Sequence, residues 1–85
     1  MKFSVEFSRR AERYLKKLDK IIAKRCIFKI EMLQENPFPR DAVKVKGREN
    51  VFRVRVGKYR ILYEVYPKIK TVLITKIDKR EKIYE

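Results

Sequence analysis

The chain has 85 residues, enough for one small domain, and 24 Lys and Arg against 11 Asp and Glu give it a formal net charge of +13. Such an excess favours a polyanionic partner, while a hydrophobic share of 45% and an aromatic share of 12% exclude a disordered basic tail. The absence of His excludes imidazole catalysis, and a single Cys excludes an internal disulfide or a zinc cluster.

The same features bear on localisation and cofactors. Cys26 alone is typical of a protein from a reducing compartment. No apolar run reaches the ~20 residues of a membrane span, and the residues after Met1 lack the apolar core of a signal peptide. With two glycines there is no Gly-rich phosphate loop. We therefore expect a cytoplasmic protein with no cofactor and no metal.

The chain begins with a strand and a helix. Lys2 to Phe7 alternates between apolar and polar residues, which predicts a half-buried strand. Ser8 stands where a helix N-cap belongs. After it, apolar residues recur at helical spacing and basic residues fill most positions between them, which predicts an amphipathic helix with a basic face. The apolar positions are Ala11, Leu15, Leu18 and Ile22.

A second helix is predicted from the N-cap Asp19 to about Glu35, before the prolines of residues 36–39. It carries two apolar stripes on roughly opposite sides. One consists of Ile22, Cys26, Ile30 and Leu33, and the other of Ile21, Phe28 and Met32. We favour coverage of the second stripe by the first helix in a helical hairpin. The alternative is an exposed patch that binds another chain.

The rest of the chain is rich in β-strand signals. Residues 42–46 form a short strand or an extended loop, and two β-rich runs, 51–56 and 59–66, flank a two-residue loop that begins with Gly57. Residues 71–77 form a further strand. The expected fold is α+β: an N-terminal strand, a two-helix hairpin and an antiparallel meander of three to four strands, with the helices on one face. The partner of the first strand stays open.

The hairpin register separates core from charge. A loop at Gly57-Lys58 pairs Val56 with Tyr59 and Arg55 with Arg60, so Arg53, Arg55 and Arg60 share one sheet face. The other face carries Phe52, Val54, Val56, Tyr59, Ile61 and Tyr63. Like charges directly opposite each other are destabilising. Three arginines together therefore favour an anion site, because Arg suits bidentate phosphate contact; the alternative is a solvated sheet face.

Three segments together resemble the RelE/ParE toxins of prokaryotic toxin–antitoxin pairs. They are the run from Phe52 to Val65, the segment Glu35–Pro39 with Lys44–Gly47, and Asp78–Glu81 with Tyr84. The resemblance covers essentially the whole chain in order. It implies one RelE-like toxin domain over residues 1–85, neutralised by a small antitoxin.

The superfamily has two branches with different targets. RelE-type toxins are ribosome-dependent endoribonucleases that cut mRNA in the A site by 2′-OH attack, without a metal. ParE-type toxins inhibit DNA gyrase. The arginine cluster together with Tyr84 favours the nuclease. The alternative is a ParE-type or degenerate toxin that inhibits gyrase or only binds its antitoxin.

The resemblance also assigns roles by motif position. Catalytic roles fall on Arg53, Arg55, Arg60, Arg80 and Tyr84. RNA-binding roles are expected at Lys46, Arg48, Lys58 and Lys79. In the best-known RelE pattern the positions of Arg53 and Arg55 are lysines. Because Arg effectively keeps its proton, Tyr84 is left as the candidate base.

The expected partners follow from charge and from the apolar stripes. They are the ribosome, mRNA and a cognate RelB-like antitoxin in a heteromeric complex. The antitoxin should be acidic and amphipathic, since a +13 domain attracts acidic residues and a spare apolar stripe binds aliphatic ones.

Overall fold

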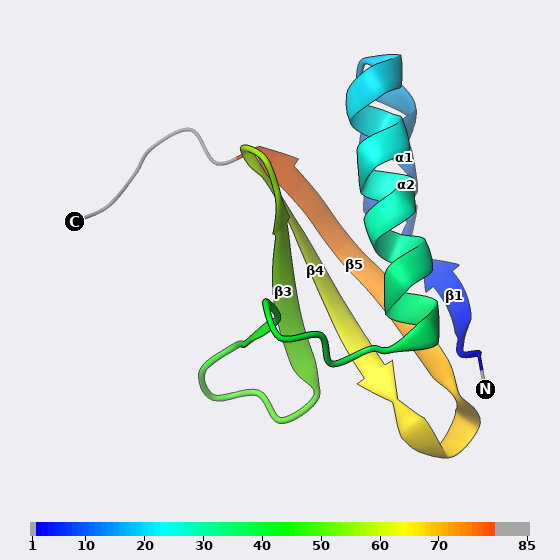
Figure 1. Ribbon diagram of the computed structural model, residues 1–85, viewed down its shortest axis with the longest axis vertical. Helices are drawn as coiled ribbons and strands as arrows, with labels where there is room; N and C mark the ends of the chain where they lie inside the picture. Colours follow the sequence, from blue (N-terminus) through cyan, green and yellow to red (C-terminus); the bar gives the residue numbers. More distant parts are fainter. Residues whose placement is uncertain (1, 80–85) are drawn as a thin grey trace.

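The computed structural model describes residues 2–79 and confirms the predicted element order (Figure 1). The elements are β1 (Ser4–Phe7), α1 (Arg9–Lys17), α2 (Lys20–Glu35), β2 (Val43–Lys44), β3 (Val51–Val56), β4 (Tyr59–Tyr66), a 3₁₀ turn (Pro67–Ile69) and β5 (Thr71–Lys79). The last strand continues two residues beyond its expected end at Ile77.

The five strands form one sheet in the order β1-β5-β4-β3-β2. The antiparallel meander of β2 to β5 is confirmed, but β1 pairs with β5 in parallel, Ser4 opposite Thr71 and Phe7 opposite Ile74. The sheet is therefore mixed and not purely antiparallel. The long connection from β1 through the helices allows this, because a parallel pair needs a crossover and cannot be closed by a tight turn.

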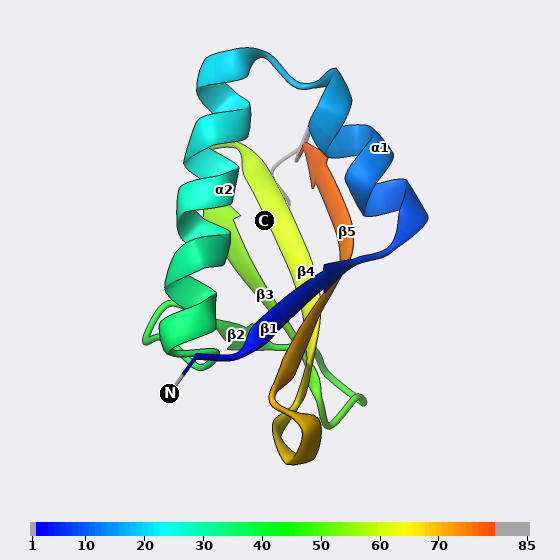
Figure 2. The same ribbon diagram turned by 90° about the vertical axis from the view of Figure 1, so that its right-hand side faces the viewer.

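Both helices begin at the predicted caps. The Ser8 hydroxyl accepts the Ala11 N–H at 3.1 Å, and the Asp19 carboxylate accepts the Ile21 N–H at 3.1 Å. Ser8 Oγ also donates to the Thr75 carbonyl of β5 at 2.7 Å, so one side chain both starts α1 and ties it to the sheet. Figure 2 shows α1 lying over β5 and α2 running beside it along the same face.

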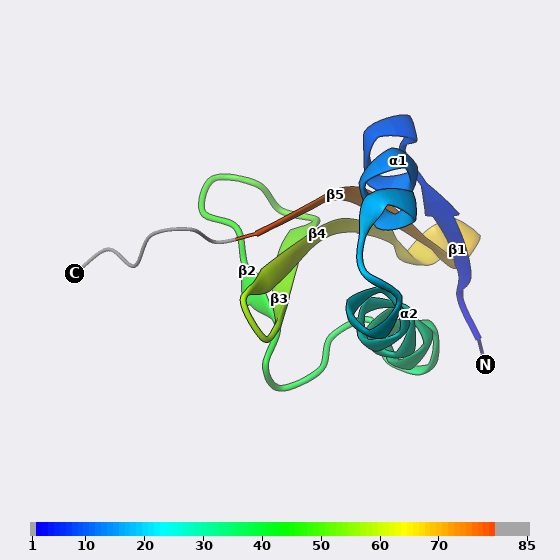
Figure 3. The same cartoon turned by 90° about the horizontal axis from the view of Figure 1, so that it is seen from above.

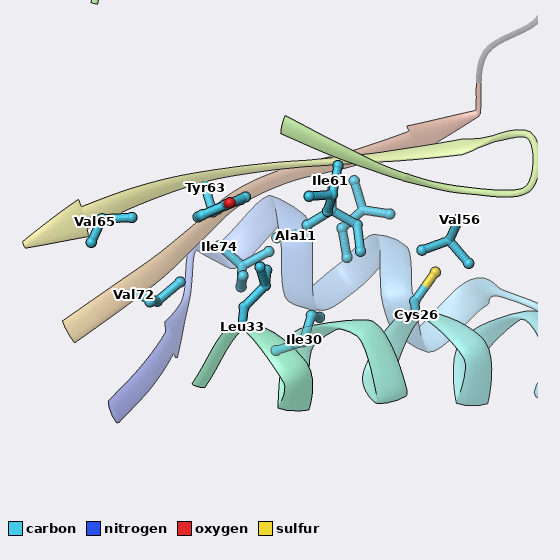
Figure 4. Close-up of a cluster of buried hydrophobic side chains, with 12 residues drawn as sticks. Ala11, Cys26, Ile30, Leu33, Val56, Ile61, Tyr63, Val65, Val72 and Ile74 are labelled. Atoms are coloured by element: carbon cyan, nitrogen blue, oxygen red, sulfur yellow. The ribbon is translucent and has the colours of Figure 1, made fainter. Parts of the chain in front are cut away.

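The core lies between the helices and this covered face of the sheet (Figure 4). From α2 it receives Cys26, Ile30 and Leu33, and from the sheet Val54, Val56, Ile61, Tyr63, Val65, Val72, Ile74 and Ile77. Tyr63 has its ring buried and donates its hydroxyl to the Pro37 carbonyl at 2.7 Å. Burial raises the pKa of Tyr63 and of the Cys26 thiol. The first apolar stripe of α2 is thus a core stripe, as expected.

The second stripe of α2 is not covered by α1, so the favoured interpretation is wrong. Ile21, Phe28 and Met32 are 69%, 64% and 46% exposed. The physical reason is that α1 packs against β5 at the side of α2 (Figure 3), with Ala11 buried in the core. Within residues 2–79, no helix is long and apolar enough to cross a membrane.

Candidate active site

The open face of the sheet carries the three predicted arginines of the hairpin. The β3–β4 register is as predicted, with Val56 opposite Tyr59 and Arg55 opposite Arg60. Gly57 turns the hairpin with φ +59°, a conformation that L-residues with side chains rarely adopt. Arg53 and Arg55 are exposed, and among residues 2–79 no ion pair joins either one to another side chain.

Arg60 differs, because it is held by an acid that the sequence reasoning missed. Its Nε donates to Asp78 Oδ1 at 3.1 Å and its Nη2 to Asp78 Oδ2 at 3.2 Å. Asp78 stands directly opposite Arg60 on β5, and Lys76 Nζ lies 3.5 Å from the same carboxylate. Arg60 and Asp78 are partly buried, with side chains 34% and 23% exposed. Among the described residues, the open face therefore holds one arginine fixed by an acid and two without such a partner.

A β-bulge places Asp78 on this face. The β4–β5 register shifts by one residue between Leu62 and Tyr63, opposite Thr75. A one-residue shift exchanges the two faces of a strand. Without it Ile77 would face the solvent side and Asp78 the core. The Thr75 carbonyl accepts from Ser8 Oγ and from Arg10 Nε at 3.0 Å, so α1 stabilises the bulge.

The expected RNA-binding residues do not form one cluster. Lys58 is exposed in the hairpin turn beside the arginines. Lys79 pairs with Tyr59, in register with the covered face, at the same end of the sheet. Lys46 is exposed in the loop after β2. An Arg48 Nη2 atom lies 3.8 Å from the Glu64 carboxylate. Glu64 is four residues after Arg60 on β4, a separation of about 13 Å at ~3.3 Å per residue.

Glu64 connects this second region to an aromatic side chain. Its carboxylate accepts the hydroxyl of Tyr66, and this bond raises the pKa of Tyr66. Lys76, which no motif singled out, joins the arginine face opposite Leu62. Arg80 and Tyr84, predicted as catalytic, lie outside the described residues. In residues 2–79, no three His, Cys, Asp or Glu side chains are grouped so that they could hold a metal ion.

A groove of about 460 Å³ lies between α2 and the tip of the β3–β4 hairpin. Its apolar lining comes from Phe28, Met32 and Val56. Four basic residues surround this lining: Lys24, Arg25, Lys29 and Arg55. Arg55 thus belongs both to the groove and to the arginine face.

One of these cations is already paired. Lys29 Nζ donates to Asp41 Oδ2 at 2.6 Å, and this bond lowers the pKa of Asp41. The groove therefore combines the exposed stripe of α2 with an excess of positive charge.

The fold is that of a RelE-like toxin. The structure superposes on RelE from the RelE–RelB complex of Pyrococcus horikoshii with a TM-score of 0.86, at 28% identity, over 98% of this chain and 100% of that one. The isolated RelE toxin of Escherichia coli gives the same TM-score at 20% identity, over 95% and 87% of the two chains, which shows the fold alone.

The sequence comparisons assign the family. RelE1, a candidate toxin of Methanocaldococcus jannaschii, is 39% identical over 88 residues, which cover 100% of this chain and 98% of that protein. The family model for the ParE toxin of the type II toxin–antitoxin system parDE matches residues 5–84. The chain belongs to this family, and with it to the RelE/ParE toxin superfamily.

Proposed function

We propose that the protein is a RelE-type toxin: a cytoplasmic, ribosome-dependent endoribonuclease that cleaves mRNA in the A site. In the proposed reaction the ribose 2′-OH loses its proton and attacks the adjacent phosphorus, and the bond to the 5′-oxygen breaks. The leaving 5′-oxygen takes up a proton, so the products are a 2′,3′-cyclic phosphate end and a 5′-hydroxyl end. The observation that supports this most is the open sheet face, where two unpaired arginines lie beside a third held by Asp78.

The chemistry assigns a role to each residue type. Arg53 and Arg55 bind the scissile phosphate and offset the negative charge that develops on it, because a guanidinium can make bidentate, charge-assisted contacts to phosphate oxygens. Arg60 donates to a non-bridging oxygen, and Arg80 supplies a further guanidinium. Tyr84 accepts the 2′-OH proton, since arginines keep theirs. Lys46, Arg48, Lys58, Lys76 and Lys79 bind the RNA backbone on either side. No step uses a metal.

A second candidate function is favoured by one specific observation. The family model that matches residues 5–84 is described as ParE toxin, and the resemblance to the ParE branch implies inhibition of DNA gyrase. On this alternative the arginine face binds its target without cleaving it, which also suits the arginines at positions 53 and 55, where the best-known RelE pattern has lysines.

The deciding experiment combines two assays on the purified protein. Toeprinting of programmed ribosomes should show cuts within the A-site codon, while gyrase supercoiling should be unaffected. The test variant Arg53→Ala/Arg55→Ala should lower the cleavage rate at least about 100-fold. Its matched control, Arg9→Ala/Arg13→Ala, removes the same charge from exposed positions of α1 and should cleave normally.

One outcome would contradict the nuclease, and another would contradict the role given to its arginine face. Inhibition of supercoiling without mRNA cleavage supports the ParE-type alternative, and equal losses in the two double variants show that net charge matters more than the arginine face. Elemental analysis of the free protein tests metal independence: a stoichiometric transition metal contradicts it.

We further propose a RelB-like antitoxin as the partner and the α2–hairpin groove as its main docking site. The RelE proteins of P. horikoshii and Methanococcus jannaschii were solved in complexes with RelB, at 28% and 30% identity to this chain. The exposed Phe28 and Met32 suit the aliphatic side of an amphipathic helix, and Lys24, Arg25 and Arg55 suit its acidic side. Such a helix would also mask Arg55.

Co-expression with the antitoxin tests this docking site. Phe28→Ser should weaken the complex about tenfold or more, because it removes an aromatic anchor. Ile69→Ser is the matched control, since Ile69 is 69% exposed in the turn before β5, against 64% for Phe28. Equal affinity of the two variants places the interface elsewhere, and an affinity that does not change with salt argues against masking of arginines.

A further inference from the structure

The pair formed by Arg60 and Asp78 is unusual on this face, because its geometry is fixed both by the strand pairing and by a second cation, Lys76. The two residues are direct cross-strand partners, and both N–O contacts lie within 3.2 Å. Lys76 lies two residues before Asp78 on β5, and its Nζ is 3.5 Å from Oδ2 of the same carboxylate. The neighbouring Arg53 and Arg55 have no such partner among residues 2–79.

The donors that remain on Arg60 are the ones a phosphate needs. Asp78 occupies the edge of the guanidinium made by Nε and Nη2. Within residues 2–79 no other group binds this side chain, so Nη1 and the outer hydrogen of Nη2 stay available there, because a planar guanidinium presents two separate donor edges. A guanidinium clamped on one edge offers the other in a set direction, whereas a free Arg must first lose its rotamer freedom.

Asp78 cannot serve to attract RNA, because it is negatively charged like the RNA backbone. Its carboxylate lowers the positive charge of the face that should attract RNA. Removing it would increase the net charge of +13 by one. A surface ion pair also adds little to stability. What the pair does supply is orientation, and it turns Arg60 away from Arg55, its like-charged neighbour on β3.

We propose that Asp78 is a positioning residue, which acts through Arg60 by aligning the free edge of its guanidinium with the scissile phosphate. The inference rests on the proposed nuclease function. It makes the β-bulge at Thr75 part of the site, since the bulge brings Asp78 to this face.

The test is a double-variant cycle measured by single-turnover cleavage on programmed ribosomes at several toxin concentrations. Asp78→Ala should lower the maximal rate about 10- to 100-fold, the effect of a misaligned group. The half-saturating toxin concentration should stay unchanged or fall, because the variant is more basic. In the Arg60→Ala background, Asp78→Ala should change the rate less than about twofold, because it has no guanidinium left to align.

Two further variants serve as controls for this interpretation. Asp78→Asn keeps the side-chain volume and should lie between wild type and Asp78→Ala. Asp41→Ala removes a carboxylate from the Lys29 ion pair beside the groove and should leave cleavage unchanged. An unchanged maximal rate in Asp78→Ala, an equal loss in both backgrounds, or a rise in the half-saturating concentration would overturn the inference.

A second measurement keeps the inference separate from the nuclease. If wild type cleaves nothing, the proposed function fails, and the Nε–Hε resonance of Arg60 decides whether Asp78 positions this side chain. A slowly exchanging resonance in wild type that is lost in Asp78→Ala supports the positioning. The same resonance in both proteins overturns it.

Discussion

The two faces of the sheet follow opposite rules, although the same strands build them. The covered face consists of apolar side chains that are almost fully buried, such as Ile61, Ile74 and Val72. The open face sets Arg55 directly opposite Arg60, an arrangement that destabilises a sheet. The difference teaches that stability comes mainly from the covered face, while the open face gives up stability for the charge that the proposed RNA-binding function requires.

The largest expected effect is on the covered face. Leu33→Ala should lower the free energy of unfolding by about 2–5 kcal/mol, because Leu33 is 0% exposed and its removal leaves a cavity between α2 and the sheet. Urea unfolding followed by circular dichroism measures this. The variant should keep normal cleavage per folded molecule, and a loss of less than about 1 kcal/mol would mean that the core closes around the missing side chain.

The next largest effect is on the open face, where substitutions should lower the cleavage rate and leave the free energy of unfolding nearly unchanged. Arg60→Ala and Arg80→Ala should each lower the cleavage rate about 100- to 1,000-fold, as for a lost donor to developing negative charge. The free energy of unfolding of Arg60→Ala should change by less than about 1 kcal/mol, since the pair with Asp78 is partly solvated. Single-turnover cleavage measures the rate, and wild-type rates in either variant would remove that residue from the site.

Much of this comparison could be predicted from the sequence. Alternation and the loop at Gly57-Lys58 were sufficient for the β3–β4 register, because a two-residue loop leaves one pairing. Ser8 and Asp19 marked both helix starts. These features depend on residues close together in the chain, where local chemistry decides the structure.

The remainder depends on contacts between distant segments. The parallel pairing of β1 with β5 joins residues about 67 apart along the chain. The exposure of Phe28 depends on where α1 packs. The role of Asp78 was missed because the predicted strand ends at Ile77, and strict alternation beyond that residue would place Asp78 on the core face. A signal was present in the sequence: the apolar residues Val72 and Ile74 are spaced by two, but the next apolar residue, Ile77, follows three positions later, which is compatible with a bulge.

A smaller effect concerns the hydroxyl on the covered face. Tyr63→Phe should lower the free energy of unfolding by about 1–2 kcal/mol near neutral pH, because the Pro37 carbonyl loses its donor. Burial raises the pKa of Tyr63, so its contribution is fully present below the unfolded pKa of ~10 and is lost as pH rises above it. The stability difference between wild type and variant should therefore shrink above pH ~10, and a constant difference would contradict the raised pKa.

The smallest effect tests the like-charge pair itself. Arg55→Thr should raise the free energy of unfolding by about 0.2–0.5 kcal/mol at low salt, since it relieves the repulsion with Arg60 and introduces a residue that favours strands. The matched control is Arg53→Thr, also an exposed position, on the same strand and face, which stands opposite Leu62. Both variants gain the strand preference of Thr, so only their difference reports the repulsion.

Because salt screens exposed charges over ~10 Å at 0.1 M, that difference should disappear at high ionic strength. Urea unfolding at two salt concentrations measures it. If both variants gain equally, Arg60 is already turned far enough toward Asp78 that its neighbour no longer matters, and the open face gives up less stability than its register implies.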